Sequence, residues 1–259
     1  MKQSRPQDTT GITPMYAEIE VVGISLPIKI GDDGLLVIDA ELGIDGIIAD
    51  AGRTCYQKFP ADEETLSLQE KNKRLVTRLV KMGHLSVLEH ASITVRIRGG
   101  SRAMTHQLVR HRHVAISQES QRYCDEGDFG YVVPPSIEEA GMVDKYTEAM
   151  AICHQLYLGI QEDLKAAKAK GILSSDRKVN EDARFILPNA VQSEIVLTAN
   201  VAEWRWIFFR RLTTHAQWEI KDICLLCLVQ FMSLTCAFND MWDYYNENGS
   251  MDGFAFTAG

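Results

Sequence analysis

Positive charge is concentrated between Arg110 and Tyr123, in the stretch R-H-R-H-V-A-I-S-Q-E-S-Q-R-Y, although the chain as a whole carries a formal net charge of -8. No Asp or Glu occurs between Glu89 and Glu119. Crowded cations repel one another unless an anion lies among them, and guanidinium groups beside Ser and Gln side chains are well suited to binding phosphate. The stretch therefore predicts a site for phosphorylated small molecules. The alternative is a solvated face, or pairing of the cations with acids from elsewhere in the fold. The cations of the acid-free interval are Arg96, Arg98, Arg102, Arg110, Arg112, His90, His106, His111 and His113.

Other chemistries find less support. Ser120 has no G-x-S-x-G motif around it and no base placed against it, so it is predicted to bind phosphate rather than to act as a nucleophile. The chain has no Walker P-loop and no G-x-G-x-x-G after a strand. We expect no metal site, because H-R-H at 111–113 would place its imidazoles on different helix faces and no H-E-x-x-H occurs. Cys224 and Cys227 form a C-x-x-C within an apolar helical run and are interpreted as core residues.

Periodicity predicts the elements that position these residues. We expect strands at 18–26 and 35–39, separated by a turn at 31–34. A helix is expected at about 63–82, with Leu75, Leu79 and Met82 on one face and Gly83 as its C-cap. Residues 92–100, S-I-T-V-R-I-R-G-G, alternate like a half-exposed strand that ends at a Gly-Gly turn. Ser101 should cap a short helix reaching about His111, on which Arg102, His106 and Arg110 would share one face.

The second half of the chain is predicted to be mostly helical. Apolar residues recur at steps of three and four from 143 to 170, which predicts a long amphipathic helix ending at Gly171. Asn200-x-x-Glu203 and Thr214-x-x-Gln217 each resemble a capping box that opens a helix. Strands early and helices late predict an α+β fold, with a mixed sheet packed with helices and a helical C-terminal third.

Length and composition limit the domain organisation and the location. The 259 residues predict a single catalytic domain at 15–246 between flexible tails at 1–14 and 247–259. The negative net charge argues against binding to nucleic acid or to an anionic membrane. The apolar run 223–238 is shorter than the roughly 20 residues of a membrane span. The N-terminus lacks the apolar core of a secretory signal, and the six cysteines are scattered, so we expect a cytoplasmic protein with reduced thiols.

Several motifs resemble those of the flavin-dependent thymidylate synthases. R-H-R at 110–112, followed after seven residues by Ser120-Gln121-Arg122, is similar to the signature of that family. Four further segments occur in the family's order and with about its spacing: A-G-R-T-C-Y (51–56), G-H-L-S-V-L-E-H (83–90), A-R-F-I-L-P (183–188) and R-L-T-T-H-A-Q-W-E-I (211–220). The resemblance implies a homotetramer with shared active sites that methylates dUMP to dTMP. Methylenetetrahydrofolate would supply the carbon and NADPH the hydride, through bound FAD.

The resemblance also implies roles for individual residues. Arg211 matches an arginine that contacts the uracil and favours ionisation at N3, and His84 matches a histidine near the folate and the nucleotide. The positions that match flavin contacts are Ser86, Arg110, His111, Arg112, Gln118 and Asn200. The positions that match or adjoin dUMP contacts are Gln107, Arg110, Gln118, Glu119, Ser120, Gln121, Arg122, Arg184 and Arg211. The FAD diphosphate and the dUMP phosphate would then both meet the acid-free segment.

The sequence departs from the family pattern at several positions. Ala115, Ser117 and Gln118 stand where relatives often have Ser, Asn and Glu. Ala202 and Trp206 stand where polar or cationic flavin contacts are common, although Trp206 could instead stack on a ring of the cofactor. One alternative is therefore a nucleotide-binding oligomer, acting as a sensor, that has lost flavin chemistry. A second is a phosphohydrolase, for which the acid-free segment offers neither carboxylate metal ligands nor an activated nucleophile.

Overall fold

The computed structural model describes residues 12–56, 66–174 and 178–256. The chain divides into two compact units. Unit 1 comprises residues 1–18, 97–109 and 117–195, and unit 2 comprises residues 19–96, 110–116 and 196–259. Most of the tail expected at 1–14, and residues 257–259 of the tail expected at 247–259, lie outside the described residues. The catalytic domain expected at 15–246 stays a prediction.

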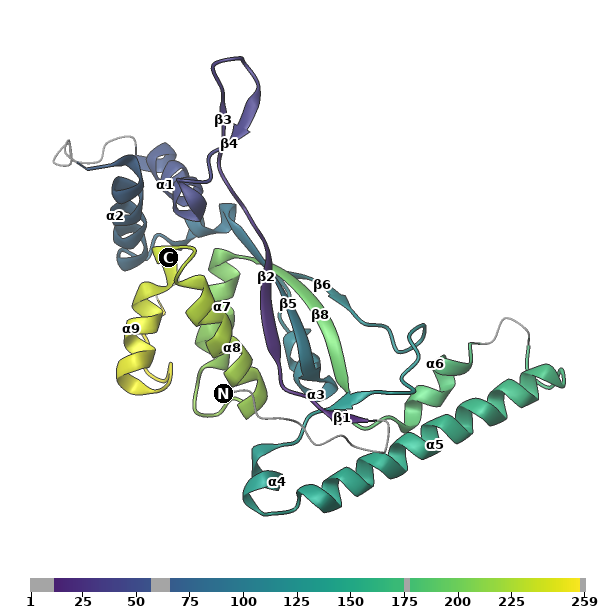
Figure 1. Ribbon diagram of the computed structural model, residues 1–259. Helices are drawn as coiled ribbons and strands as arrows, with labels where there is room; N and C mark the ends of the chain where they lie inside the picture. Colours follow the sequence, from purple (N-terminus) through teal and green to yellow (C-terminus); the bar gives the residue numbers. More distant parts are fainter. Residues whose placement is uncertain (1–11, 57–65, 175–177, 257–259) are drawn as a thin grey trace. The chain divides into compact units, whose positions relative to one another are not determined.

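Four described strands precede the first helix, strands and helices are then interspersed up to residue 200, and the described elements after residue 200 are helical, which confirms the predicted α+β class (Figure 1). The strands are β1 (Thr13–Pro14), β2 (Glu18–Ile24), β3 (Ile28–Ile30), β4 (Leu36–Ile38), β5 (Ser92–Ser101), β6 (Val114–Gln118), β7 (Gly130–Tyr131) and β8 (Gln192–Asn200). The α-helices are α1 (Gly43–Tyr56), α2 (Leu68–Lys81), α3 (Arg102–Leu108), α4 (Pro135–Glu139), α5 (Val143–Ala169), α6 (Val179–Ala183), α7 (Val201–Arg211), α8 (Trp218–Phe231) and α9 (Asn239–Asn248). The 3₁₀ helices are η1 (Leu85–His90), η2 (Arg184–Ile186) and η3 (Cys236–Phe238). The largest sheet has the strand order β2-β5-β8-β6.

Strand β5 shows the alternation that its sequence predicts. Ile93, Val95 and Ile97 are buried, whereas the residues between them are partly exposed. The expected Gly-Gly turn is wrong, because the strand continues to Ser101. Gly99 instead adopts a left-handed conformation with φ of 71° inside the strand. A Cβ atom at this position would overlap the carbonyl oxygen of Tyr16, so only glycine fits there.

Helix α3 begins as predicted but is shorter than expected. The Ser101 hydroxyl accepts a hydrogen bond from the backbone N–H of Met104 at 3.0 Å, which confirms the N-cap. The helix ends at Leu108. The expectation that Arg102, His106 and Arg110 share one helical face is therefore wrong, since Arg110 lies beyond the helix. For the same reason His111 and His113 do not lie on helix faces.

The long helix of unit 1 is confirmed. Helix α5 spans 27 residues, and Gly171 follows it with φ of 72°. Its buried residues are Met150 and Tyr157 together with two polar ones, His154 and Gln161. The helix packs through Met150 on a core cluster that also contains Ile12, Phe129, Tyr131 and Val191.

The first part of unit 2 shows several differences from the prediction. Helix α1 was not predicted. Helix α2 begins at Leu68 rather than at about 63, because Ser67 and Glu70 form a reciprocal capping box, and residues 63–65 lie outside the described residues. Leu75 and Leu79 are buried as expected, but Met82 is exposed at 57% and does not belong to that face. Gly83 adopts φ of 76°, as expected for a C-terminal cap.

The early strands form a hairpin that was only partly predicted. The first strand ends at Ile24 rather than at residue 26, and a strand at Ile28–Ile30 was missed. This strand, β3, pairs antiparallel with β4. The predicted turn at 31–34 is confirmed by a hydrogen bond from the Gly34 N–H to the Gly31 carbonyl at 2.9 Å.

Helix α7 carries residues of the candidate site, and helix α8 packs against it. The Asn200 side chain accepts from the Glu203 N–H at 2.7 Å, which confirms the helix start after Asn200. The capping box expected at Thr214 is wrong, because Gln217 itself caps α8 by accepting from the Ile220 N–H at 3.1 Å. Trp204 of α7 is buried and donates its indole N–H to the Ile93 carbonyl at 3.0 Å.

Cys224 and Cys227 are buried in α8, as predicted for core residues. Burial raises the pKa of the Cys224 thiol to about 12. The apolar run that begins at Ile223 leaves α8 after Phe231. Among the described residues, no helix combines the length and the apolar character needed to cross a membrane.

Candidate functional site

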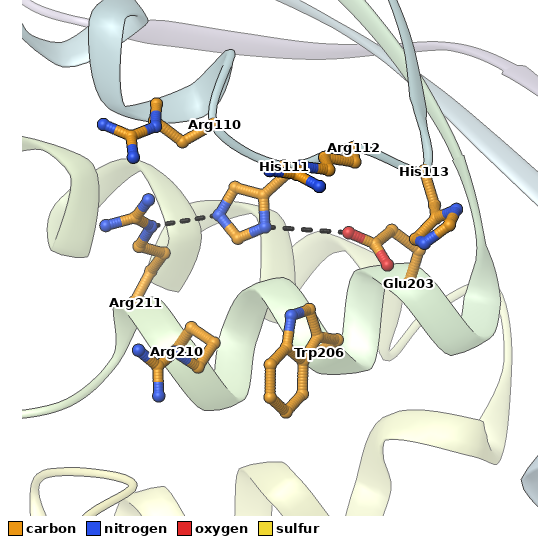
Figure 2. Close-up of a pocket in the computed structure, with 8 residues that line it drawn as sticks. All are labelled: Arg110, His111, Arg112, His113, Glu203, Trp206, Arg210 and Arg211. Atoms are coloured by element: carbon orange, nitrogen blue, oxygen red, sulfur yellow. Dashed lines mark hydrogen bonds and ion pairs between the residues drawn. The ribbon is translucent and has the colours of Figure 1, made fainter.

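The segment Arg110–His113, here called the RHRH segment, faces helix α7 across a cavity of about 370 Å³ (Figure 2). We call this the cationic cavity. Glu203, Trp206 and Arg210 project into it because they are spaced by three and four residues on one helical face. The opposite face of α7, with Trp204 and Phe208, is buried. The complete lining is Arg110, His111, Arg112, His113, Glu203, Trp206, Arg210 and Arg211.

A second cavity of about 600 Å³ adjoins the first, since His113, Glu203 and Trp206 line both. We call it the adjoining cavity. It brings together His84, Ser86 and Asn200, three of the residues predicted from the sequence. The remaining lining is Gly83, Leu85, Glu89, Ala202 and Phe256. The side-chain oxygen Oδ1 of Asn200 already caps α7. The side-chain NH₂ group of Asn200 is therefore the part suited to binding a ligand.

His111 lies between Arg211 and Glu203 (Figure 2). The Arg211 Nε–H donates to His111 Nε2 at 3.0 Å, and His111 Nδ1 lies 3.6 Å from Glu203 Oε1. Burial, followed by the charges of Arg211 and Arg210, lowers the pKa of His111 to about 4. The ring is therefore neutral at pH 7, and the contact with Glu203 is not an ion pair. Both neighbours favour the tautomer with hydrogen on Nδ1, because Nε2 must accept from Arg211 and a carboxylate faces Nδ1.

The lowered pKa of His111 makes the stability of the protein depend on pH. Below about pH 6.5 the imidazole of the unfolded chain becomes protonated, whereas that of the folded chain stays neutral down to about pH 4. The unfolded state therefore binds more protons in this range, and stability falls as the pH is lowered. The wild-type protein should therefore lose about 2–3 kcal/mol relative to His111→Gln between pH 7 and pH 4. Urea unfolding of both proteins across this range measures the difference. Above pH 7 the difference should be constant, and a constant difference down to pH 4 would contradict the prediction.

The arginines of the acid-free interval fall into two groups. Two of them contact carboxylates, as does Arg122 just beyond the interval, so the alternative of pairing with acids from elsewhere holds for these three arginines. The pairs are Arg96 with Glu20 at 3.3 Å, Arg98 with Glu194 at 3.5 Å and Arg122 with Glu181 at 2.9 Å. In contrast, the described part of the chain offers no carboxylate partner to Arg110 or Arg112. The cationic cavity therefore contains positive charge suited to an anionic ligand.

The remaining predicted residues lie in unit 1. Gln118 donates its amide to Thr105 Oγ1 and to Ser193 Oγ, both at 2.9 Å. The backbone N–H of Glu119 donates to the Glu194 carbonyl at 2.8 Å. These bonds anchor the strand end that precedes Ser120. Gln107 lies on α3, and Gln121 is buried.

A turn after this strand end presents Ser120 and Arg122. The Ser120 carbonyl accepts from the backbone N–H groups of Tyr123 and Cys124, both at 2.9 Å. Glu181 joins two of the predicted residues, since its carboxylate pairs with Arg122 at 2.9 Å and its carbonyl accepts from Arg184 Nε at 3.2 Å. The Arg122–Glu181 pair is half-exposed, and such pairs contribute little stability. A phosphate could therefore replace the carboxylate of Glu181 at small cost.

Some residues of the site were missed or misinterpreted in the sequence. Glu203 was recognised only as part of a cap, and Arg210 was not noted, although their helical spacing with Trp206 could have revealed both. Phe256 gave no signal, because residues 247–259 were interpreted as a tail. Glu126 of unit 1 was also missed: burial, followed by the charge of Glu119, raises its pKa to about 7. Among the described residues, no cluster of three or more His, Cys, Asp or Glu side chains is arranged to hold a metal ion.

The cationic cavity presents cations and an exposed indole to the same space, an arrangement suited to a phosphorylated ligand with a planar ring. Comparisons with known proteins give the family of this chain. A profile of the family described as "thymidylate synthase complementing protein" matches residues 36–235. The chain belongs to this family.

Curated relatives carry a consistent name. A "flavin-dependent thymidylate synthase" of Mycobacteroides abscessus is 37% identical over 204 residues, which cover 76% of this chain and 80% of the relative. A protein of the same name from Mycobacterium sp. (strain JLS) is 36% identical to this chain, over 77% of this chain and 80% of the relative. In Mycobacterium tuberculosis (strain ATCC 25177 / H37Ra), the identity is 36% over 72% of this chain and 75% of the relative. The resemblance inferred from the motifs is therefore confirmed.

Proposed function

We propose that this protein is a flavin-dependent thymidylate synthase that converts dUMP to dTMP. Methylenetetrahydrofolate is the carbon donor, NADPH the hydride donor and FAD the bound flavin. The observation that carries the proposal is the cationic cavity, in which Arg110 and Arg112 have no carboxylate partner among the described residues. Guanidinium groups can bind the diphosphate of FAD, and Trp206 offers a face to a planar ring, so the residues present fit this cofactor.

The protein's part in the chemistry is positioning and charge stabilisation. FAD, when bound, supplies the hydride chemistry, which no amino-acid side chain can perform. Arg211 places its positive charge at the pyrimidine, where it stabilises negative charge that develops on the ring. His111 is neutral and accepts a hydrogen bond from Arg211, so it orients the guanidinium without competing for the ligand's charge. Glu203 faces the other ring nitrogen and favours the tautomer that this hydrogen bond requires.

The other predicted residues are assigned to binding. Ser86, Arg110, His111, Arg112, Gln118 and Asn200 contact the flavin, and His84 lies near the folate. The residues assigned to dUMP are Gln107, Arg110, Gln118, Glu119, Ser120, Gln121, Arg122, Arg184 and Arg211. We further propose that the protein is a cytoplasmic homotetramer in which several chains contribute to each active site, and that it binds neither nucleic acid nor membrane.

Replacing Ser120 by alanine should weaken dUMP binding but leave measurable turnover. The hydroxyl is proposed to hold the phosphate, and a hydrogen bond to a charged group contributes about 1.5–3 kcal/mol, which corresponds to a ten- to hundredfold loss of affinity. The measurement is the dUMP dissociation constant by calorimetry, together with kcat at saturating dUMP. A complete loss of turnover with unchanged dUMP affinity would show that Ser120 takes part in the chemistry.

The spectrum of the purified protein tests the proposed activity. The protein should be yellow as purified or after addition of FAD, and the flavin absorbance should bleach when NADPH and dUMP are present. Conversion of dUMP to dTMP should then require methylenetetrahydrofolate. A protein that binds dUMP without consuming NADPH would instead be a sensor, and release of phosphate without a spectral change would indicate a phosphohydrolase. Either outcome would overturn the proposal.

A further inference from the structure

Trp206 is unusual among the described aromatic residues of unit 2 because it is 40% exposed. It projects from α7 into the space shared by the cationic cavity and the adjoining cavity. Burying an indole is strongly favourable, so its exposure at the wall of two cavities leaves a large apolar face available to a ligand. Ala202, one turn earlier on the same helix, lines the adjoining cavity with only a methyl group.

Two phenylalanines hold the Trp206 ring in place. The Trp206 and Phe209 centroids are 5.6 Å apart, the Trp206 and Phe256 centroids are 5.4 Å apart with planes at 67°, and the Phe209 and Phe256 centroids are 5.0 Å apart. Each ring therefore contacts the other two. The Arg210 guanidinium lies 5.6 Å from the centre of the Trp206 ring, within the range of a cation–π contact. A ring restrained in this way loses little conformational entropy when a ligand stacks on it.

Phe256 reaches this cluster because the segment that contains it, residues 249–256, is hydrogen-bonded to the end of α7. We call it the C-terminal segment. The Met251 N–H donates to the Leu212 carbonyl at 2.8 Å, and the Met251 side chain is buried. The Asp252 carboxylate accepts from the Thr214 N–H at 3.0 Å, and the Asp252 carbonyl accepts from the Tyr244 hydroxyl at 2.7 Å. These hydrogen bonds place Phe256 at the wall of the adjoining cavity.

The chemistry of the ligand follows from what surrounds the indole. Arg110, Arg112 and Arg211 line the same cavity as Trp206, so a ligand that uses the whole cavity carries both an anionic group and a planar ring. We propose that Trp206, supported by Phe209 and Phe256, is a stacking surface for a ring of the flavin dinucleotide, and that the C-terminal segment serves to hold Phe256 in this position. This inference rests on the proposed function. It assigns a cofactor-binding role to Phe256, which was not considered in the sequence, and decides for stacking at Trp206, where the sequence left that role open.

Affinity for FAD tests the proposal without relying on turnover. The full-length protein would be titrated with FAD, and the dissociation constant measured by calorimetry and by quenching of flavin fluorescence. Trp206→Ala and Trp206→Leu should each raise the FAD dissociation constant about tenfold or more, whereas Trp206→Phe should change it only a few-fold. Leucine keeps the apolar volume but lacks the π face, so it separates stacking from packing. Phe256→Ala should weaken binding by a smaller factor.

Phe254→Ala is the matched control. Phe254 lies in the same segment, but its ring packs on Tyr244, with the two ring centroids 5.2 Å apart. It does not line either cavity that contains Trp206. Its replacement should leave FAD affinity unchanged. Titrations with FMN and with ADP then show which ring stacks, because FMN carries the isoalloxazine ring of FAD and ADP carries its adenine ring. Trp206→Ala should weaken the binding of only one of these two probes.

The outcomes separate this inference from the proposed function. If the wild-type protein binds no FAD, the proposed cofactor is wrong. If the wild-type binds FAD and Trp206→Leu and Phe256→Ala bind it equally well, the stacking surface is wrong while the proposed function stands. Circular dichroism and thermal unfolding show whether each variant is folded, and Trp206→Leu and Phe256→Ala keep the test valid should Trp206→Ala fail to fold.

Discussion

Replacing Arg211 by methionine is expected to lower kcat for dTMP formation about a hundredfold or more. Methionine fills a similar volume but carries no positive charge, so negative charge that develops on the pyrimidine would lose its stabilising partner. Removing one such electrostatic contact from an enzyme costs about 10²–10³ in kcat. The measurement is steady-state dTMP formation at saturating dUMP, compared with the dissociation constants of dUMP and FAD.

Arg211→Lys refines this experiment. Lysine keeps the charge but lacks the planar fork and the Nε–H that donates to His111 at 3.0 Å. It should therefore recover only part of the lost turnover. Arg78→Lys, on an exposed position of α2, is the control for a conservative change far from the cavities. Turnover of Arg211→Met within threefold of the wild-type value would show that this guanidinium has no role in the chemistry.

Replacing Asp240 by alanine is expected to destabilise the protein by about 3–5 kcal/mol. The Arg205 side chain is only 3% exposed, and its two terminal nitrogens contact the Asp240 carboxylate at 2.6 and 2.7 Å. The same guanidinium donates to the Ala237 carbonyl, so Arg205 connects α7 both to η3 and, through Asp240, to the first turn of α9. Without Asp240, a buried positive charge would remain without its counter-charge. Urea unfolding, with the midpoint and the slope analysed together, measures the loss.

Two further variants test whether the destabilisation of Asp240→Ala comes from leaving Arg205 without its counter-charge. Asp222→Ala removes an exposed aspartate from α8 and should change stability by no more than about 0.5 kcal/mol. The double variant Arg205→Met with Asp240→Leu removes both charges and should be considerably more stable than Asp240→Ala alone. If Asp240→Ala and Asp222→Ala were equally stable, Arg205 would have to be satisfied by other groups.

The sequence was sufficient for elements whose signals are local. The cap at Ser101 and the end of α5 at Gly171 were predicted because one side chain or one glycine determines each of them. The strand β3 was missed because three residues are too few to show a period. Helix α1 was missed although Ile44, Ile47 and Ile48 follow a helical spacing, because its three glycines weaken the helical signal. The end of α3 at Leu108 could not be predicted, because the residues beyond it continue to look helical while the chain leaves the helix to form the RHRH segment.

The site was predicted in part for the same reason. The RHRH segment attracted attention through its charge, and Arg211 and Asn200 through a resemblance of motifs. The role of Glu203 depends on its contact with the ring of His111, which lies 92 positions earlier in the chain. The position of Phe256 depends on hydrogen bonds from residues 251 and 252 to the end of α7. Such contacts between distant segments leave no periodic pattern in a sequence.

The hydrogen bond between Arg211 and His111 connects a residue assigned to the pyrimidine with a residue assigned to the flavin. A ligand that orders one of these side chains also restricts the other. The two ligands are then thermodynamically linked, and dUMP must tighten the binding of FAD by the same factor by which FAD tightens the binding of dUMP. Cooperativity of this kind requires no movement of the backbone, because the second ligand meets a side chain that the first has already ordered.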